Sequence, residues 1–185
     1  MKKLSFVSVL AIIVAVVALN SCSKVASLLL YDVPLQSGSV TINVPATSDT
    51  GATASGSATN SINIDSVIKA YTANALGVSN ITSLKLTSIN IIVNNPDSTN
   101  NLQNFSSLYA SFTANTSSTP YVINIPNNPN TYAASLSVPV DSTAELKSYL
   151  NGNNFTYSVG GHLRAATTTT LNCTVNFTFD IHVQG

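Results

Sequence analysis

The sequence predicts a mainly β protein: a two-sheet antiparallel β-sandwich, Ig-like or jelly-roll-like, with two short helices and a preceding signal-peptide helix. The strongest observation is the alternation of apolar and polar residues near the C-terminus, where apolar side chains hold every odd position from Leu171 to Val183. A second segment with the same period, Phe155–Leu163, precedes it. Turn-forming Asn, Gly and Pro residues separate several further short segments of this kind, as in sandwich proteins.

The first 21 residues predict a secretory signal peptide. Lys2 and Lys3 precede the apolar stretch Leu4–Leu19, which is shorter than the roughly 20 residues that a membrane span needs. The stretch leads into Leu19-Asn20-Ser21-Cys22, which resembles the lipobox of bacterial lipoproteins, whose cysteine is acylated. We expect residues 1–21 to be removed and Cys22 to carry lipid. An ordinary signal peptide or a single-span anchor, with an incidental Cys22, is the alternative.

The mature chain divides into a lipidated N-terminus and tether, residues 22–38, and a β-sandwich domain, residues 39–185. Within the tether, Val25–Leu30 is apolar, so it could form a first strand or lie along the domain or the membrane. Val40–Val44 alternates with period two and predicts a half-buried strand.

Residues 46–60 contain no apolar side chain larger than alanine and predict a flexible, solvated loop. A short strand is expected over Ser61–Ile64. A helix should then begin at Asp65 or Ser66 and end at Leu76, closed by Gly77 in the left-handed conformation.

A second helix is predicted further along the chain by the capping box Ser142-Thr143-Ala144-Glu145. Between the helices, Ile81–Val93 predicts a strand whose apolar positions change phase near Ser88, which indicates a β-bulge. Ser135–Val140 is expected to be an edge strand, because Pro139 cannot donate to a ladder. Two more strands follow from the alternating residues Leu108, Ala110 and Phe112, and Tyr121, Ile123 and Ile125.

The last two strands are adjacent in the chain, and their spacing predicts a hairpin that turns at Ala165–Thr169. In that register Cys173 would face Gly161, and every apolar side chain of both strands would stay on the core side. Cys173 should then be a buried structural thiol and not a nucleophile, because a reactive thiolate needs partial exposure and a positive neighbour. With Cys22 lipidated, no intramolecular disulfide is possible.

The composition disfavours one class of function, nucleic-acid binding. Charged residues make up only 8% of the chain, with seven basic and seven acidic side chains. No basic patch can form to neutralise phosphates, so nucleic-acid binding is disfavoured. Ser, Thr and Asn supply most of the polar surface instead.

The candidate chemical groups have structural explanations, and we expect no catalytic residue, metal or cofactor. His162 and His182 would lie about ten positions apart in the predicted hairpin, too far to share a metal. The loop Asn94–Asn101 is rich in oxygen ligands, yet it offers one carboxylate where calcium usually gathers several. No G-x-S-x-G elbow occurs. Tyr109 and Tyr132 are the aromatic residues that could be exposed to bind a sugar.

The pattern of elements resembles a group of small, mostly uncharacterised outer-membrane lipoproteins of Bacteroidetes-type bacteria. The resemblance lies in the lipobox, in the segments DSVIKAY, ITSLKLTSINIIVNNPD and DSTAELKSYL, and in the closing pair of strands. It implies anchoring at the outer membrane, but it carries no activity. Three Asp-Ser-Val/Thr triplets are similar to the acceptor motif of the general O-glycosylation system of such bacteria, or they serve as helix caps and turns. The candidate acceptors are Ser66, Ser98 and Ser142.

We therefore expect a lipid-anchored cell-envelope protein that acts as a non-catalytic binding or structural module. Its expected partners are the membrane, through the lipid, and a glycan or an envelope protein. The alternatives are a hydrolase that acts on envelope or other glycans, and a glycan-binding lipoprotein.

Overall fold

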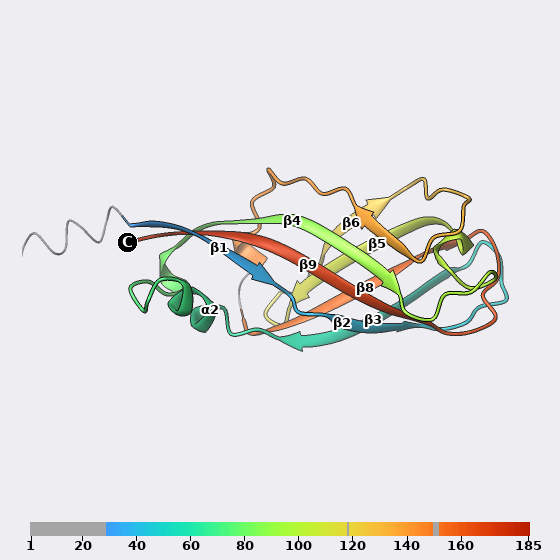
Figure 1. Ribbon diagram of the computed structural model, residues 1–185, viewed down its shortest axis with the longest axis horizontal. Coiled ribbons are helices and arrows are strands. Elements are labelled where there is room, and N and C mark those ends of the chain that lie inside the picture. Colours follow the sequence, from blue (N-terminus) through green and yellow to red (C-terminus); the bar gives the residue numbers. More distant parts are fainter. Residues whose placement is uncertain (1–28, 118, 150–151) are drawn as a thin grey trace, which may run out of the picture.

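The computed structural model describes residues 29–117, 119–149 and 152–185. The predicted signal peptide and Cys22 lie outside these residues, so both remain predictions. The described chain forms two antiparallel sheets that pack face to face in an elongated body, with the one α-helix of the described residues at one end (Figure 1).

The first sheet has the order β1-β9-β4-β7, and β2 pairs with the other half of β9 along the β1 edge. Its strands are β1 (Leu30–Gln36), β2 (Val40–Val44), β4 (Ile81–Val93), β7 (Ser135–Val138) and β9 (Leu171–Gln184). Gly38, with φ of 71°, makes the bend between β1 and β2. β1 thus places in the sheet seven residues that the sequence analysis assigned to the tether.

The second sheet has the order β3-β8-β5-β6. Its strands are β3 (Thr53–Ser61), β5 (Phe105–Ala114), β6 (Tyr121–Ile125) and β8 (Asn154–Leu163). If β1 and β2 count as one bent edge strand, every later connection except the β5–β6 hairpin crosses from one sheet to the other. The predicted sandwich is confirmed, and its connectivity is that of a jelly roll.

The core lies between the sheets and confirms the predicted faces of the longest strands. Every odd residue of β9 from Leu171 to Val183 is buried, as are the odd residues of β8. Phe112 of β5 joins the two sheets, because its ring lies 5.8 Å from that of Phe177 and 5.1 Å from that of Phe179. Edge-to-face contacts of this kind stabilise a core beyond the apolar area that they bury.

The predicted hairpin between the last two strands is wrong. β8 pairs with β3 and β5, whereas β9 belongs to the opposite sheet. Cys173 is buried as expected, but its partners are Ile42 and Val93. The alternation of apolar and polar residues identifies the inward face of each strand. This alternation is the same whether two strands pair within one sheet or face each other across the core, so it does not show which strands pair.

The predicted loop over residues 46–60 is also wrong, because Thr53–Ser61 forms strand β3. The inward residues of β3 are small because β2 approaches closely. A Cβ atom on Gly56 would lie 2.1 Å from the Asn43 carbonyl oxygen. Close packing of the two strands therefore removes the large apolar side chains from which the strand could be predicted.

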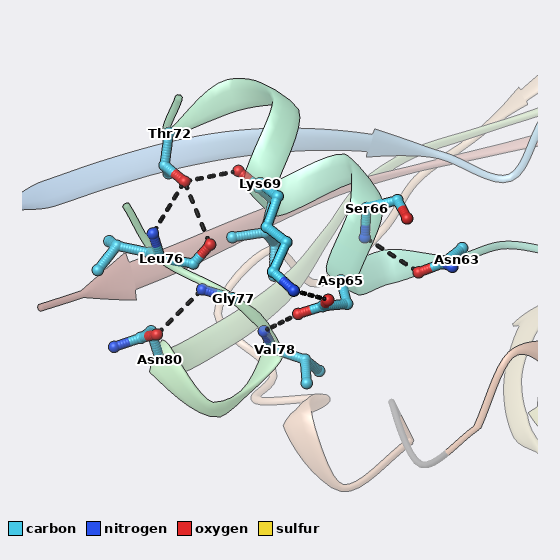
Figure 2. A network of polar contacts seen from close by, with 10 residues as sticks. Asn63, Asp65, Ser66, Lys69, Thr72, Leu76, Gly77, Val78 and Asn80 are labelled. Carbon is cyan, nitrogen blue, oxygen red and sulfur yellow. Dashed lines mark hydrogen bonds and ion pairs between the residues drawn. The ribbon is translucent and has the colours of Figure 1, made fainter. Parts of the chain in front are cut away.

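The first helix is shorter than predicted. Helix α2 spans Ile64–Tyr71, and Asn63 is its N-cap, because the Asn63 side chain accepts a hydrogen bond from Ser66 N. The chain then turns through Ala73 and Asn74, which hold the positive φ angles that we assigned to Gly77. Figure 2 shows how Thr72 closes this turn, since its hydroxyl accepts a hydrogen bond from Leu76 N.

The second predicted helix does not form in the described residues, where only a 3₁₀ turn, Lys147–Tyr149, is present. Asp141 accepts from Thr143 N as a cap would. Glu145 instead reaches β4, where it accepts hydrogen bonds from Leu84 N at 2.9 Å and from the Ser83 hydroxyl at 2.6 Å. A tertiary contact thus replaces the reciprocal hydrogen bond of the capping box.

Two finer predictions are confirmed. The pairing of β4 with β9 shifts register between Leu86 and Ser88, which is the expected bulge. β7 ends the first sheet and pairs with β4 alone, as predicted for an edge strand. Within the described ranges, no helix has both the length and the apolar character needed to cross a membrane.

Candidate functional site

Three loops meet at the end of the sandwich away from α2 and the start of β1 (Figure 1). They are the β4–β5 loop, residues 94–104, the β6–β7 loop, residues 126–134, and the β8–β9 loop, residues 164–170. Backbone hydrogen bonds join them, from Leu102 N to the Ala133 carbonyl and from Arg164 N to the Asn104 carbonyl. We call this region the loop end.

Four buried asparagines hold the loop end together: Asn100, Asn101, Asn104 and Asn128. The Asn104 amide donates to the carbonyls of Thr99 and Ala166, at 2.9 and 2.7 Å. An amide side chain has both donors and acceptors, so it can satisfy buried peptide groups of either kind. No buried side-chain nitrogen or oxygen of the described residues lacks a hydrogen-bond partner. These buried asparagines therefore join the loops of the loop end through neutral groups.

The carboxylate of Asp97, the one acidic side chain in the β4–β5 loop, is held by its own loop. Its oxygens accept from the side chain of Asn100 and from the backbone and hydroxyl of Thr99. These hydrogen bonds, with Asn100 first, lower the pKa of Asp97 to about 2. The geometry supports a role in turn structure over one in calcium binding. Among the described residues, no three His, Cys, Asp or Glu side chains cluster to hold a metal.

Arg164 is the only arginine of the chain, and it projects from the end of β8 into the loop end. Its Nη1 donates to the Gln103 carbonyl at 3.0 Å, and its Nη2 donates to the Asn128 carbonyl at 2.7 Å. Weaker contacts of 3.4 Å join Nη1 to Pro129 and Asn130. The guanidinium thus ties the β4–β5 loop to the β6–β7 loop.

An open depression of about 360 Å³ lies beside Arg164. Its lining is neutral apart from the guanidinium and includes Ser98, Gln103, Asn130 and Thr168. A hollow of this size falls at the lower end of the range for small-ligand sites. Because the loops around it are fixed, a ligand would bind with little ordering of the protein.

A second depression, of about 370 Å³, lies on the outer face of the second sheet. Tyr109, Asn124 and His162 line it, and the His162 ring contacts the Thr53 hydroxyl at 3.2 Å. Tyr109 pairs with Gly160 of β8. Tyr109 is half-buried, whereas Tyr132, in the β6–β7 loop, is 56% exposed.

The candidate acceptor serines Ser66, Ser98 and Ser142 are all exposed. Ser66 lies in the polar network around α2, where Asp65 pairs with Lys69 and accepts from Val78 N (Figure 2). The Ser66 hydroxyl takes part in none of the contacts drawn there. The structure therefore leaves this hydroxyl open to modification without the loss of a cap.

The remaining candidate groups do not come together. His162 and His182 lie in different sheets, and the ring of His182 pairs with Asp32. Burial raises the pKa of the Cys173 thiol to about 11. The thiol is therefore protonated at neutral pH and a poor nucleophile.

Sequence reasoning missed Arg164 and the four buried asparagines. A usable signal was present for Arg164, because the only arginine of the chain directly follows an alternating strand that ends at Leu163. The asparagines carried no such signal, since Asn is abundant in the exposed turns as well.

No family model matches the chain, and no curated protein matches it. Solved structures align over most of its length, at low similarity. A structure of Desmodium yellow mottle tymovirus has 13% identity over 85% of this chain and 87% of that chain, with a TM-score of 0.30. Turnip Yellow Mosaic Virus gives 15% identity over 85% and 94%, with a TM-score of 0.27, and Mud Crab Dicistrovirus gives 12% over 86% and 70%, with 0.26.

Proposed function

We propose that this chain is a lipid-anchored protein of the cell envelope, a non-catalytic binding module that presents its loop end away from the membrane. The observation that carries the proposal is that the start of β1 and the loop end lie at opposite ends of the sandwich. Cys22 precedes Leu29, the first described residue, by seven positions, which span about 25 Å when fully extended. Lipid on Cys22 would keep the β1 end near the bilayer and the loop end furthest from it.

The β1 end has a surface that suits this orientation. Leu30 is 72% exposed, Tyr71 is 55% exposed and Val78 is 47% exposed. Leu30 begins β1, Tyr71 ends α2 and Val78 donates a hydrogen bond to Asp65 of α2, so all three lie at the end where α2 and the start of β1 meet. Figure 1 shows this end of the sandwich. Apolar and tyrosine side chains are favoured at the interface between lipid and water.

The use of the titratable groups favours binding over catalysis. Asp97 and Asp141 accept hydrogen bonds first from the side chains of Asn100 and Thr143 and then from backbone amides, and these bonds lower the pKa of both carboxyls. At Glu145, desolvation is the largest single effect and raises the pKa, but hydrogen bonds from the Ser83 hydroxyl and from backbone amides together lower it. All three carboxyls are therefore held in structural roles. A carboxyl that acts as a general acid would need a pKa raised toward the working pH, and a nucleophile would need to be accessible to the substrate. Apart from Arg164 and two alanines, the lining of the depression at the loop end consists of hydroxyl and amide side chains, which favours a glycan as the ligand.

We also propose that at least one of Ser66, Ser98 and Ser142 carries an O-linked glycan. Exposure of all three supports this proposal. Intact-mass analysis of the mature protein and of a triple serine-to-alanine variant tests it, because only the native chain should carry added sugar mass.

The anchor and the absence of catalysis need separate experiments. The wild-type protein should partition into detergent and show a mass that fits diacylglycerol and an acyl chain on Cys22, whereas Cys22→Ser should stay uncleaved or be released. An unmodified Cys22 would contradict the anchor. A broad hydrolase screen should show no turnover, and turnover lost on a single carboxylate or serine substitution would identify an enzyme instead.

A further inference from the structure

The guanidinium of Arg164 has donors to spare. An arginine carries five N–H donors in a planar fork. Contacts to Gln103, Asn128 and the 129–130 segment use both hydrogens of Nη1 and one of Nη2. Within the part of the chain that the structure describes, Nε–H and the other Nη2 hydrogen donate to no oxygen. No buried side-chain nitrogen there is left without a partner, so the unbonded Nε is open to solvent.

The charge of Arg164 is also unpaired. Among the described residues, no carboxylate lies within 4.0 Å of the guanidinium, and all of its acceptors are neutral amide oxygens. Asp97, in the loop beside the depression, has its carboxylate occupied by Thr99 and Asn100. Its negative charge would weaken the binding of an anion, but it does not neutralise Arg164 by direct contact.

The surroundings narrow the chemical class of the ligand. A guanidinium with free donors matches a carboxylate, which it binds through short, charge-assisted hydrogen bonds. The rest of the lining, which includes Ser98, Gln103, Asn130 and Thr168, offers hydroxyls and amides that suit sugar hydroxyls. The only apolar side chains in the lining are those of Ala165 and Ala166. The carboxylate of a peptide terminus would also fit these donors, but a saccharide in addition presents several hydroxyls to the hydroxyls and amides of the lining.

We propose that the depression at the loop end binds a carboxylated saccharide, with the sugar carboxylate on the free donors of Arg164 and the sugar hydroxyls on the neutral lining. This inference rests on the proposed function as a binding module and names the class of its ligand. The volume of about 360 Å³ suits one or two sugar units.

The test uses the mature chain in a non-ionic detergent, and it exploits the single arginine. One Arg Nε–H signal should appear in the nitrogen–proton correlation spectrum of the wild type, and it reports on this site alone. Glucuronate should shift that signal in a saturable way. Glucose differs from glucuronate by lacking the carboxylate and should leave it in place, while acetate should bind more weakly than glucuronate because it lacks the hydroxyls.

Variants give a second readout. Arg164→Met should weaken glucuronate binding on the order of 10- to 100-fold, the effect of losing hydrogen bonds to a charged group. Lys147→Met removes one exposed positive charge outside the depression and should change the affinity little. Calorimetric binding measurements should be paired with thermal denaturation, since Arg164→Met also removes the clamp between two loops.

Three results would overturn the inference without any use of variants. They are an Nε–H signal that glucuronate does not move, an equal shift with glucose, and an affinity for acetate equal to that for glucuronate, which would indicate a carboxylate site of peptide type. Detergent partitioning and the hydrolase screen are independent of these results. The proposed ligand class can therefore be refuted while the proposed function stands, and the proposed function can be refuted while Arg164 still binds glucuronate.

Discussion

The burial of Cys173 allows a quantitative prediction about native-state labelling. The side chain is 2% exposed and lies on β9, which has neighbours on both edges. Burial raises the thiol pKa from 9.0 to about 11. At pH 8 this shift alone lowers the thiolate fraction about 100-fold, because each pKa unit changes it tenfold. The remaining route is opening of β9, and a central strand opens only with the whole domain. A domain stability of about 5 kcal/mol would then limit labelling several thousand-fold.

The assay compares reaction with a chromogenic aromatic disulfide in buffer and in guanidinium at the same pH. Native Cys173 should react at least 100-fold more slowly than the unfolded chain, and the Cys22→Ser variant assigns any fast-reacting thiol. Labelling within 100-fold of the unfolded rate would refute the burial of this face of β9.

The raised pKa of the Cys173 thiol also predicts a loss of stability at alkaline pH. The folded pKa lies above the unfolded one, so the thiol's contribution is present below pH 9 and is lost as the pH rises from 9 through about 11.

Three further predictions concern the second sheet and the loop end. Gly161→Ala should destabilise the domain by roughly 1–3 kcal/mol in thermal denaturation, since its Cβ would lie 2.0 Å from the Ser107 carbonyl oxygen, whereas Ser158→Ala, which faces outward on the same strand, should be nearly neutral. Asn128→Ala should cost about 1–3 kcal/mol in the same assay, because it removes the two hydrogen bonds that the Asn128 amide donates to the buried carbonyls of Leu102 and Phe105; an unchanged melting temperature would contradict this role. The pKa of Asp97 is depressed to about 2, so its contribution is present above pH 3.8 and fades as the pH falls from 3.8 through 2. Amide exchange in its loop should show this loss, and an Asp97→Asn variant should not.

The sequence was sufficient to predict which side of each long strand faces the core, but not which strands pair. β9 shows why, since its odd residues would be buried in either sheet. The connection between Leu163 and Leu171 is long enough to turn a hairpin or to cross the roughly 10 Å between packed sheets. Local alternation does not distinguish the two outcomes. Which sheet each of the last two strands joins depends on the pairing of β8 with β3 and of β9 with β4, and β3 and β4 are distant from them in the chain.

Elements with small or polar inward faces were missed for a different reason. β3 buries Ala54 and half-buries Gly56 and Ala58, so no apolar period appears in its sequence. The constraint comes from β2, whose backbone approaches too closely for a larger residue at Gly56. At Glu145 the local signal was present, but the carboxylate accepts two hydrogen bonds from β4, from Leu84 N and from the Ser83 hydroxyl, in place of the single backbone hydrogen bond of a capping box.

The buried polar groups of the loop end are mainly neutral amides. Its asparagines satisfy buried peptide groups without formal charge, so they hold three loops together without the desolvation cost of buried ion pairs. This leaves Arg164 as the one charged side chain in the lining of the depression. Changes at the asparagines should therefore alter stability first. Changes at Arg164 should alter both the stability of the two loops that it ties together and the choice of ligand, because the neutral lining can fit many polar molecules and only the guanidinium favours an anion among them.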